Sequence, residues 1–201
     1  PVSPGVNAQR QEIFHTYDTN GNRTGTAVAA QLVPERDYQV IGNANPRFSL
    51  GFRNSTTWGR FTGSFLVRAV QGNDIFNNTA IVYASKSGAT QGSNFIRSAL
   101  NDGLDPTAAN LFSSRFIEDG SFIRLQNVTI GYNVPTRRVL PRVSSMNVYV
   151  SGDNLWLSTR YSGLDPEVDV AAGANGIPSR GIDYLQYPRA RVFTFGTKLG
   201  F

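Results

Sequence analysis

The residues best spaced for chemistry are three carboxylates near the end of the sequence. Asp165, Glu167 and Asp169 alternate in the stretch GLDPEVDV. Carboxylate oxygens are ligands that Ca²⁺ prefers, so this spacing allows a calcium site. Pro166 favours a plain loop turn instead, and that is the interpretation we adopt. The stretch DTNGN at 18–22 lacks the glycine and glutamate spacing of an EF-hand, so an Asn-Gly turn explains it.

Catalytic constellations are excluded by composition. His15 is the single histidine and there is no cysteine among the 201 residues. His-based triads, multi-His metal sites, thiolate ligands and disulfides are therefore ruled out. We expect no enzyme, no catalytic residue, no metal site and no cofactor in this stretch, and we interpret His15 as a loop residue.

Four aromatic side chains near the C-terminal end could bind a ligand without transforming it. They are Trp156, Tyr161, Tyr184 and Tyr187. Their rings could stack on a sugar. The structural alternative is packing within a loop, or an aromatic girdle at the edge of a bilayer.

These candidates lie among segments whose side chains alternate between apolar and polar, which is the period of a β-strand. The clearest such segment is RVFTFGTKLGF, which closes the sequence. Its large apolar residues are Phe193, Phe195, Leu199 and Phe201, and small or polar residues stand between them. With four similar segments, the predicted strands are approximately 46–55, 60–71, 121–134, 144–153 and 190–201.

The connections between the predicted strands are alternately short and long. Short turns lie near 55–59 and at 135–141, whereas the connections 72–120 and 154–189 are long. Compact soluble domains rarely carry several such loops, but outer-membrane barrels combine short periplasmic turns with long extracellular loops. We therefore predict an all-β fold of antiparallel transmembrane β-barrel strands, with Phe201 at the periplasmic rim.

Five crossings do not complete a barrel, because bacterial single-chain barrels have even strand numbers. Residues 1–201 are therefore expected to be one portion of a transmembrane barrel. Simple alternation places Arg124 and Gln126 on the lipid face with Val128 and Ile130, which is tolerable only where that strand projects above the hydrocarbon layer. A wet lumen is expected to receive Arg68, Asn127, Asn133 and Lys198.

Several other classes are less compatible with the sequence. The net charge is +5, but the basic residues are scattered singly apart from Arg137-Arg138, so we expect no nucleic-acid partner. The sequence starts without a signal-peptide pattern and contains no apolar run long enough for a transmembrane helix. A secreted all-β carbohydrate-binding module would need shorter loops. A small passive porin or barrel enzyme disagrees with the odd number of crossings and the missing catalytic residues.

Motifs over roughly 36–201 resemble the SusC/RagA-like TonB-dependent transporters of Bacteroidota. They occur in the order and at the spacing typical of that family. The motifs are VIGNANPRFSLGFRNSTTWGRFTGSFLVRAVQGNDIFNNT at 40–79, FIEDGSFIRLQNVTIGYNVP at 116–135, VYVSGDNLWLSTRYSGLDPEVD at 148–169 and GIDYLQYPRARVFTFGTKLGF at 181–201.

The resemblance implies the C-terminal portion of a 22-stranded barrel in the outer membrane of a Gram-negative bacterium. It also implies an N-terminal plug, a SusD-like surface lipoprotein that acts as a lid, and import of oligosaccharides or peptides powered through TonB. The plug and the TonB-binding part are missing from this stretch. Trp156, Tyr161, Tyr184 and Tyr187 remain candidate contacts for ligand or lid, with an aromatic girdle or loop packing as the alternative. In the closing segment, Phe193, Phe195, Leu199 and Phe201 would face lipid and belong to the C-terminal signal for barrel assembly.

Overall fold

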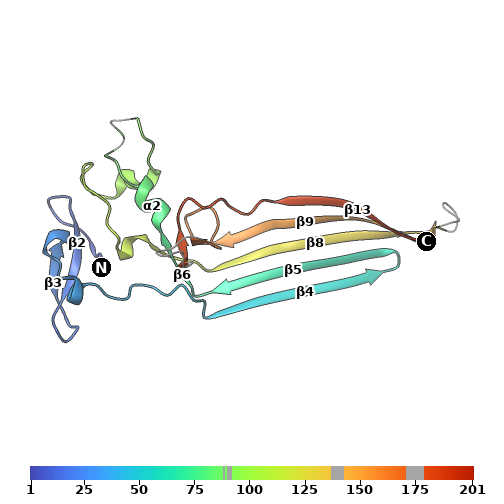
Figure 1. Ribbon diagram of the computed structural model, residues 1–201, viewed down its shortest axis with the longest axis horizontal. Coiled ribbons are helices and arrows are strands. Elements are labelled where there is room, and N and C mark those ends of the chain that lie inside the picture. Colours follow the sequence, from blue (N-terminus) through green and yellow to red (C-terminus); the bar gives the residue numbers. More distant parts are fainter. Residues whose placement is uncertain (88, 90–91, 137–142, 171–178) are drawn as a thin grey trace. The chain divides into compact units, whose positions relative to one another are not determined.

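A computed structural model describes all residues except 88, 90–91, 137–142 and 171–178 (Figure 1). The chain divides into two compact units, each assembled from three separate segments. We call them the loop unit and the strand unit. The loop unit comprises Pro1–Asn45, Asn73–Asp119 and Tyr161–Gln186, and the strand unit comprises Pro46–Gly72, Gly120–Arg160 and Tyr187–Phe201.

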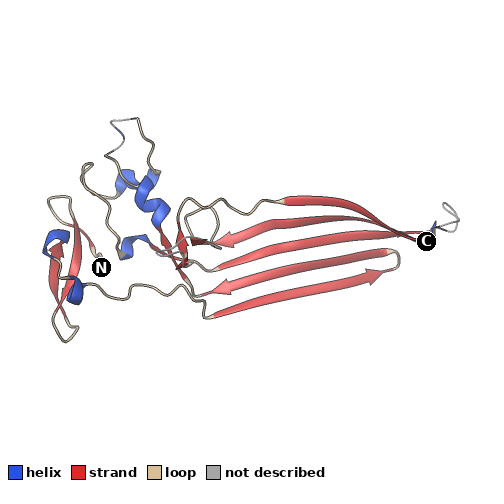
Figure 2. Ribbon diagram, in the orientation of Figure 1, coloured by secondary structure: helices blue, strands red, loops and turns tan. Residues whose placement is uncertain are grey.

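The strand unit is one open antiparallel sheet of five long strands in the order β13-β9-β8-β5-β4 (Figures 1 and 2). Their bounds are β4 Phe48–Trp58, β5 Phe61–Gln71, β8 Phe122–Val134, β9 Ser145–Thr159 and β13 Val192–Gly200. The strands lie over the five alternating segments, and β9 extends beyond the predicted 144–153. Most of the predicted turn at 135–141 lies outside the described residues.

The turn between β4 and β5 contains only Gly59 and Arg60, because Trp58 pairs directly with Phe61. Gly59 has a φ of 60°, a left-handed conformation that glycine adopts without steric cost. Such a turn matches the twist of the two strands that it joins. No helix among the described residues is long and apolar enough to cross a membrane.

A β-bulge in β8 changes which residues share a face. Leu66 of β5 pairs with Asn127, but the next residue, Val67, pairs with Leu125, so Gln126 is an extra residue in β8. An extra residue shifts the alternation by one position. Arg124 therefore lies on the same face as Asn127 and opposite to Val128. The expectation that Arg124 shares the apolar face is wrong, and its strand need not leave the hydrocarbon layer for that reason.

The loop unit contains three small sheets and short helices. The sheets are β1-β2-β3, β12-β6-β7 and β10-β11. Strand bounds are β1 Gly5–Val6, β2 Glu12–Tyr17, β3 Arg23–Val28, β6 Asp74–Asn77, β7 Ile117–Asp119, β10 Asp169–Val170, β11 Ser179–Arg180 and β12 Ile182–Asp183. The described helices are η1 Ala29–Gln31, α1 Pro34–Asp37, α2 Asn78–Tyr83, η3 Arg97–Asn101 and η4 Ser114–Phe116.

Two links hold segments of the loop unit that are distant in sequence. β6 pairs antiparallel with β7, with Asp74 opposite Asp119, so the two ends of the connection 74–119 meet. The buried carboxylate of Asp37 accepts hydrogen bonds from the backbone amides of Tyr17 and Val33, at 2.9 and 2.8 Å. Carboxylates that accept backbone amides in this way fix a chain path without a large core.

Candidate functional site

The largest candidate surface is the apolar face of the strand unit. Cross-strand register places most of the large apolar side chains of the five strands on it, and rings from neighbouring strands lie close together. The centroids of Phe52 and Phe65 are 5.8 Å apart, and those of Phe61 and Tyr132 are 5.0 Å apart. The face includes Phe48, Leu50, Phe52, Trp58, Phe61, Phe65, Val67, Ile123, Leu125, Val128, Ile130, Tyr132, Val148, Val150, Trp156, Phe193, Phe195 and Leu199.

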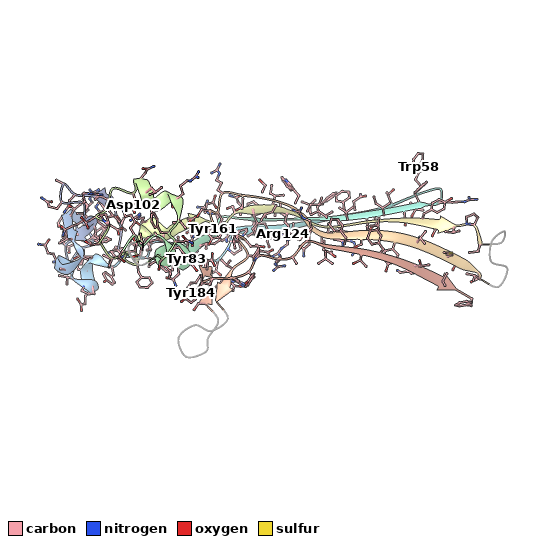
Figure 3. All side chains as sticks on the ribbon, turned by 90° about the horizontal axis from the view of Figure 1, so that it is seen from above. Trp58, Tyr83, Asp102, Arg124, Tyr161 and Tyr184 are labelled. Atoms are coloured by element: carbon pink, nitrogen blue, oxygen red, sulfur yellow. The ribbon has the colours of Figure 1, made fainter. Side chains whose placement is uncertain are left out.

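Most of these side chains are exposed, and the others are half-buried. Trp58 is 83% exposed beside the short turn and projects from the sheet, while Phe201, which follows β13, is 89% exposed (Figure 3). Contiguous apolar patches of this extent are rare on soluble monomers and mark a surface that contacts lipid or protein.

The opposite face of the same strands is polar and cross-linked by side-chain hydrogen bonds. The amide of Asn127 donates to Asp153 at 2.7 Å, and that of Asn147 donates to Asn133 at 2.8 Å. Lys198 lies 5.8 Å above the ring of Tyr149. Arg68, Asn127, Asn133 and Lys198, which were predicted to share a wet face, lie on this polar face.

Two arginines enclose one aromatic ring on the polar face. The guanidinium carbons of Arg68 and Arg124 lie 5.9 and 5.4 Å from the ring centroid of Phe122. Arg124 is only 1% exposed and donates to the amide oxygen of Asn154 at 2.6 Å (Figure 3). Such cation–π contacts help to hold a cation over the surface of a sheet. The sequence does not reveal this cluster, because the bulge at Gln126 brings its members onto one face.

The four aromatic candidates lie in different environments. Trp156 pairs with Leu125 and therefore lies on the apolar face, where a girdle residue would stand. Tyr184 is half exposed in the loop unit, and Tyr187 is 93% exposed in the strand unit. A ligand or lid role stays a prediction for these three residues.

Tyr161 differs from the other three because it is only 5% exposed and packs with Ile75 and Val168. Its hydroxyl donates to the buried carboxylate of Asp183 at 2.5 Å (Figure 3). Burial, together with that carboxylate, raises the pKa of Tyr161 far above its usual value. The residue therefore has a packing role in the loop unit, and its ring is not available to stack on a ligand in this conformation.

Asp183 also organises the segment that follows it. Thr79 of α2 donates its hydroxyl hydrogen to Asp183 at 3.1 Å, and the Thr79 oxygen accepts the backbone amide of Leu185 at 2.8 Å. Leu185 has a φ of 54°, which is unusual for a bulky side chain. Tyr184 and Leu185 are thus presented to solvent from a segment that is fixed by hydrogen bonds.

Two of the three carboxylates with metal-ligand spacing accept backbone amides. Asp165 accepts the backbone amide of Glu167 at 2.9 Å, and Asp169 accepts that of Gly181 at 3.0 Å. Asp18 in DTNGN accepts the backbone amide of Asn22, which lowers the pKa of Asp18. Within the described residues, no group of three His, Cys, Asp or Glu side chains is arranged to hold a metal ion.

His15 lies on strand β2, opposite Thr26 of β3, so its assignment to a loop is wrong. Alternation in the first 35 residues is weak, and the sequence gives little signal for this small sheet.

An open antiparallel sheet with one apolar and one polar face is the structure of a piece of β-barrel wall. Solved structures with the same fold include those of the RagAB peptide importer. The closed-closed state of that importer matches with a TM-score of 0.75 at 20% sequence identity, and the open-open state with a TM-score of 0.74 at 19% identity. Each match covers 100% of this chain and 22% of the importer chain. The predicted all-β, antiparallel fold class is confirmed, and the sheet of this chain is not closed.

Sequence comparison gives the family. No family model matches the chain. TonB-dependent receptor P3 of Formosa agariphila is 31% identical over 199 residues, which are 94% of this chain and 19% of that protein. TonB-dependent receptor SusC of Bacteroides thetaiotaomicron is 30% identical over 191 residues, which are 92% of this chain and 17% of that protein. The chain therefore belongs among the homologues of TonB-dependent receptors, as the motifs predicted, and it spans about a fifth of the length of these relatives.

Proposed function

We propose that this chain forms part of the wall and external loops of a TonB-dependent nutrient importer in the outer membrane of a Gram-negative bacterium. The observation that carries the proposal is the apolar face that continues across all five long strands, backed by a polar face. Lipid would cover the first face and water in the lumen would cover the second. Its role is transport rather than catalysis.

The length of β4 supports a membrane crossing. Its 11 residues extend roughly 35 Å at about 3.3 Å per residue. With a tilt of about 45°, the strand rises through about 25 Å, which is the height of the apolar band on outer-membrane barrels. The aromatic side chains at both ends of this band, Trp58 and Trp156 among them, would lie at the two interfaces.

The other parts of the transporter would come from outside this stretch. We expect the remaining barrel strands, an N-terminal plug that TonB engages, and a SusD-like surface lipoprotein. Oligosaccharides or peptides are the expected cargo, and the solved relative is described as a peptide importer. Trp156, Tyr184 and Tyr187 are the candidate contacts for ligand or lid, although the apolar-face position of Trp156 favours a girdle role.

The closing strand would also help assembly. Phe193, Phe195 and Leu199 of β13 would face lipid, and Phe201 would stand at the periplasmic rim as part of the signal that the barrel-insertion machinery reads. Deletion of Phe201 is expected to reduce assembly, measured as the heat-modifiable fraction on gels. Undiminished assembly without Phe201 would remove this part of the proposal.

The central test is fractionation of the native protein. We expect it in the outer membrane, within a particle far larger than the 22.0 kDa of this chain. Recovery as a soluble 22 kDa monomer would contradict the proposal and favour a secreted all-β carbohydrate-binding module.

A further inference from the structure

Strand β13 lies at the edge of the five-stranded sheet, where it pairs with β9 (Figure 1). The apolar alternation of β13 does not fix that pairing by itself. A slip of one residue would turn every side chain to the other face, so the alternation excludes it. A slip of two residues returns each side chain to its own face. The observed register, with Gly196 opposite Tyr149, therefore needs a feature that does not recur at every second residue.

The ring of Tyr149 supplies such a feature on the polar face. Its tip lies over Gly196, where a Cβ would meet Cζ and Oη of Tyr149 and lie 2.7 Å from Cε1. Non-bonded carbon atoms prefer separations of about 3.5–4.0 Å, so a residue larger than glycine at this position would displace the ring. Two residues further along β13, Nζ of Lys198 lies 5.8 Å from the ring centroid. The ring therefore lies against the backbone at Gly196 and close to a cation of the same strand.

The residue opposite Tyr149 on its other side is also a glycine, but the space above that glycine is filled by other side chains. Gly131 of β8 pairs with Tyr149. A Cβ at Gly131 would lie 2.6 Å from Oγ1 of Thr62 and 3.2 Å from the amide group of Asn147. The ring of Tyr149 thus leans toward β13 rather than toward β8, and its contact reports the pairing of the last strand.

We infer that the contact between Tyr149 and Gly196 sets the register of the closing strand during assembly. The inference rests on the proposed function, since it concerns the closing strand of an assembled barrel. A slip of two residues in either direction places Thr194 or Lys198 opposite Tyr149. Either residue carries a side chain into the space that the ring fills above Gly196, so both slipped registers lose the contact. Glycine inside a strand is destabilising, and an aromatic ring from the neighbouring strand compensates for it only in the observed register.

Cysteine crosslinking in the full transporter measures the register directly. Residues 1–201 contain no cysteine, and any cysteine elsewhere in the transporter is first replaced. Ser151→Cys with Thr194→Cys reports the observed pairing. Ser151→Cys with Val192→Cys, and Asp153→Cys with Thr194→Cys, report slips of two residues in the two directions. In the observed register these last two pairs are diagonal neighbours about 7–8 Å apart, beyond the usual reach of a disulfide.

Oxidation of isolated outer membranes should crosslink almost only the first pair when Tyr149 and Gly196 are intact. Gly196→Ala and Tyr149→Ala should each raise crosslinking of the slipped pairs about fivefold, the factor that corresponds to a cross-strand contact of about 1 kcal/mol. The double variant should match Tyr149→Ala, because both changes remove the same contact. Tyr149→Phe keeps the ring and should give the wild-type pattern.

Gly51→Ala is the matched control. Gly51 lies on the polar face of β4, opposite Arg68, and a Cβ there would meet no atom within 4 Å. The same change from glycine to alanine should therefore leave the crosslinking pattern of the wild type. If Gly196→Ala fails to assemble, Tyr149→Ala still decides the matter, because it removes atoms and creates no overlap.

Three outcomes would overturn the inference: crosslinking of the wild type through a slipped pair, an unchanged pattern in Tyr149→Ala, or an equal rise in Gly51→Ala. None of them removes the transporter from the outer membrane. Failure of the proposed function would instead be recognised before oxidation, as absence of the chain from that membrane.

Discussion

The two units of this chain are stabilised in different ways. In the loop unit, buried side chains such as Phe14, Ile75 and Leu104 form small cores, whereas Val70 and Phe122 are the only buried hydrophobic residues of the described strand unit. The large apolar residues of the strand unit point outward instead. A sheet without a core of its own needs an apolar partner, lipid or protein, on its apolar face, whereas the loop unit buries apolar side chains internally.

The two units also differ in where their polar side chains make hydrogen bonds. The loop unit fixes its short elements with carboxylates that are buried or nearly so, namely Asp37, Asp102 and Asp183. Among the described residues of the strand unit, hydrogen bonds such as Asn127–Asp153 and Asn147–Asn133 connect side chains of adjacent strands on the polar face. The loop unit is thus held together by hydrogen-bonded carboxylates and small cores, and the strand unit is a sheet with one apolar and one polar face.

The largest effect should come from placing a charge on the apolar face. Val128→Arg is expected to destabilise the assembled barrel by about 2–4 kcal/mol, the cost of a lipid-facing arginine near the midplane. Thr129→Arg, one residue further along β8, faces the opposite side and is the matched control. Urea unfolding in lipid vesicles measures both. Equal costs for the two variants would break the assignment of the faces.

The next effect should appear in the loop unit alone. Asp102 accepts hydrogen bonds from Lys86 at 2.7 Å and Arg115 at 2.9 Å (Figure 3). Asp102→Asn should weaken this unit by about 2–3 kcal/mol, because two cations lose a charged partner. Faster cleavage of external loops by an added protease, with unchanged heat-modifiable mobility, is the expected result. Glu35→Gln, an exposed neutralisation, is the control.

Acid should reproduce this effect in the wild type. Burial alone would raise the pKa of Asp102, but the hydrogen bonds from Lys86 and Arg115 outweigh it and lower that pKa below its usual value. A lowered pKa stabilises the unit above the unfolded value of about 3.9, and this stabilisation disappears as the pH falls through the folded pKa. Protease resistance should therefore be flat from pH 7 to 5 and fall below pH 4. A similar fall in Asp102→Asn would exclude Asp102 as its source.

A smaller loss is expected at the Tyr161–Asp183 contact. Tyr161→Phe removes one of the two described donors to a buried carboxylate and should cost about 1–2 kcal/mol. The readout is again loop proteolysis with the barrel intact. Tyr184→Phe changes an exposed hydroxyl and should leave cleavage unaltered. Equal sensitivity of the two variants would show that burial of Tyr161 does not matter.

The smallest effect on stability should come from the exposed loop aromatics. Tyr187→Ala is expected to change stability by less than about 0.5 kcal/mol, because the side chain buries almost nothing. If Tyr187 contacts ligand or lid, uptake of cargo at low concentration should fall nevertheless. Trp156→Leu keeps an apolar side chain on the lipid face and should not affect uptake. Reduced uptake in the Trp156 variant alone would reverse these assignments.

The sequence predicts the strand unit well, because one physical signal governs it. In a strand with one apolar face, apolar residues recur at every second position. The pattern from Phe193 to Leu199 therefore predicts both a strand and the residues on each of its faces. The bulge at Gln126 leaves no such signal, since an extra residue only shifts the alternation. For this reason, simple alternation assigns Arg124 to the apolar face, whereas the structure has it on the polar face.

The loop unit could not be predicted in the same way. Its short strands and helices have no sustained period, and its fold depends on contacts between residues far apart in sequence, such as Tyr161 with Asp183. Aromatic type alone did not distinguish the buried Tyr161 from the exposed Tyr187, because loops contain both.

The pairing of Asp74 with Asp119 has a consequence for the order of folding. β4 and β5 are joined by two residues, and such hairpins form within about 1–10 μs. β5 and β8 are separated by a long connection, and bringing its ends together costs chain entropy that grows with its length. Once β6 and β7 have paired, that connection is already closed between Asp74 and Asp119, a few residues from each strand. Pairing of β6 with β7 would thus hasten the pairing of β5 with β8.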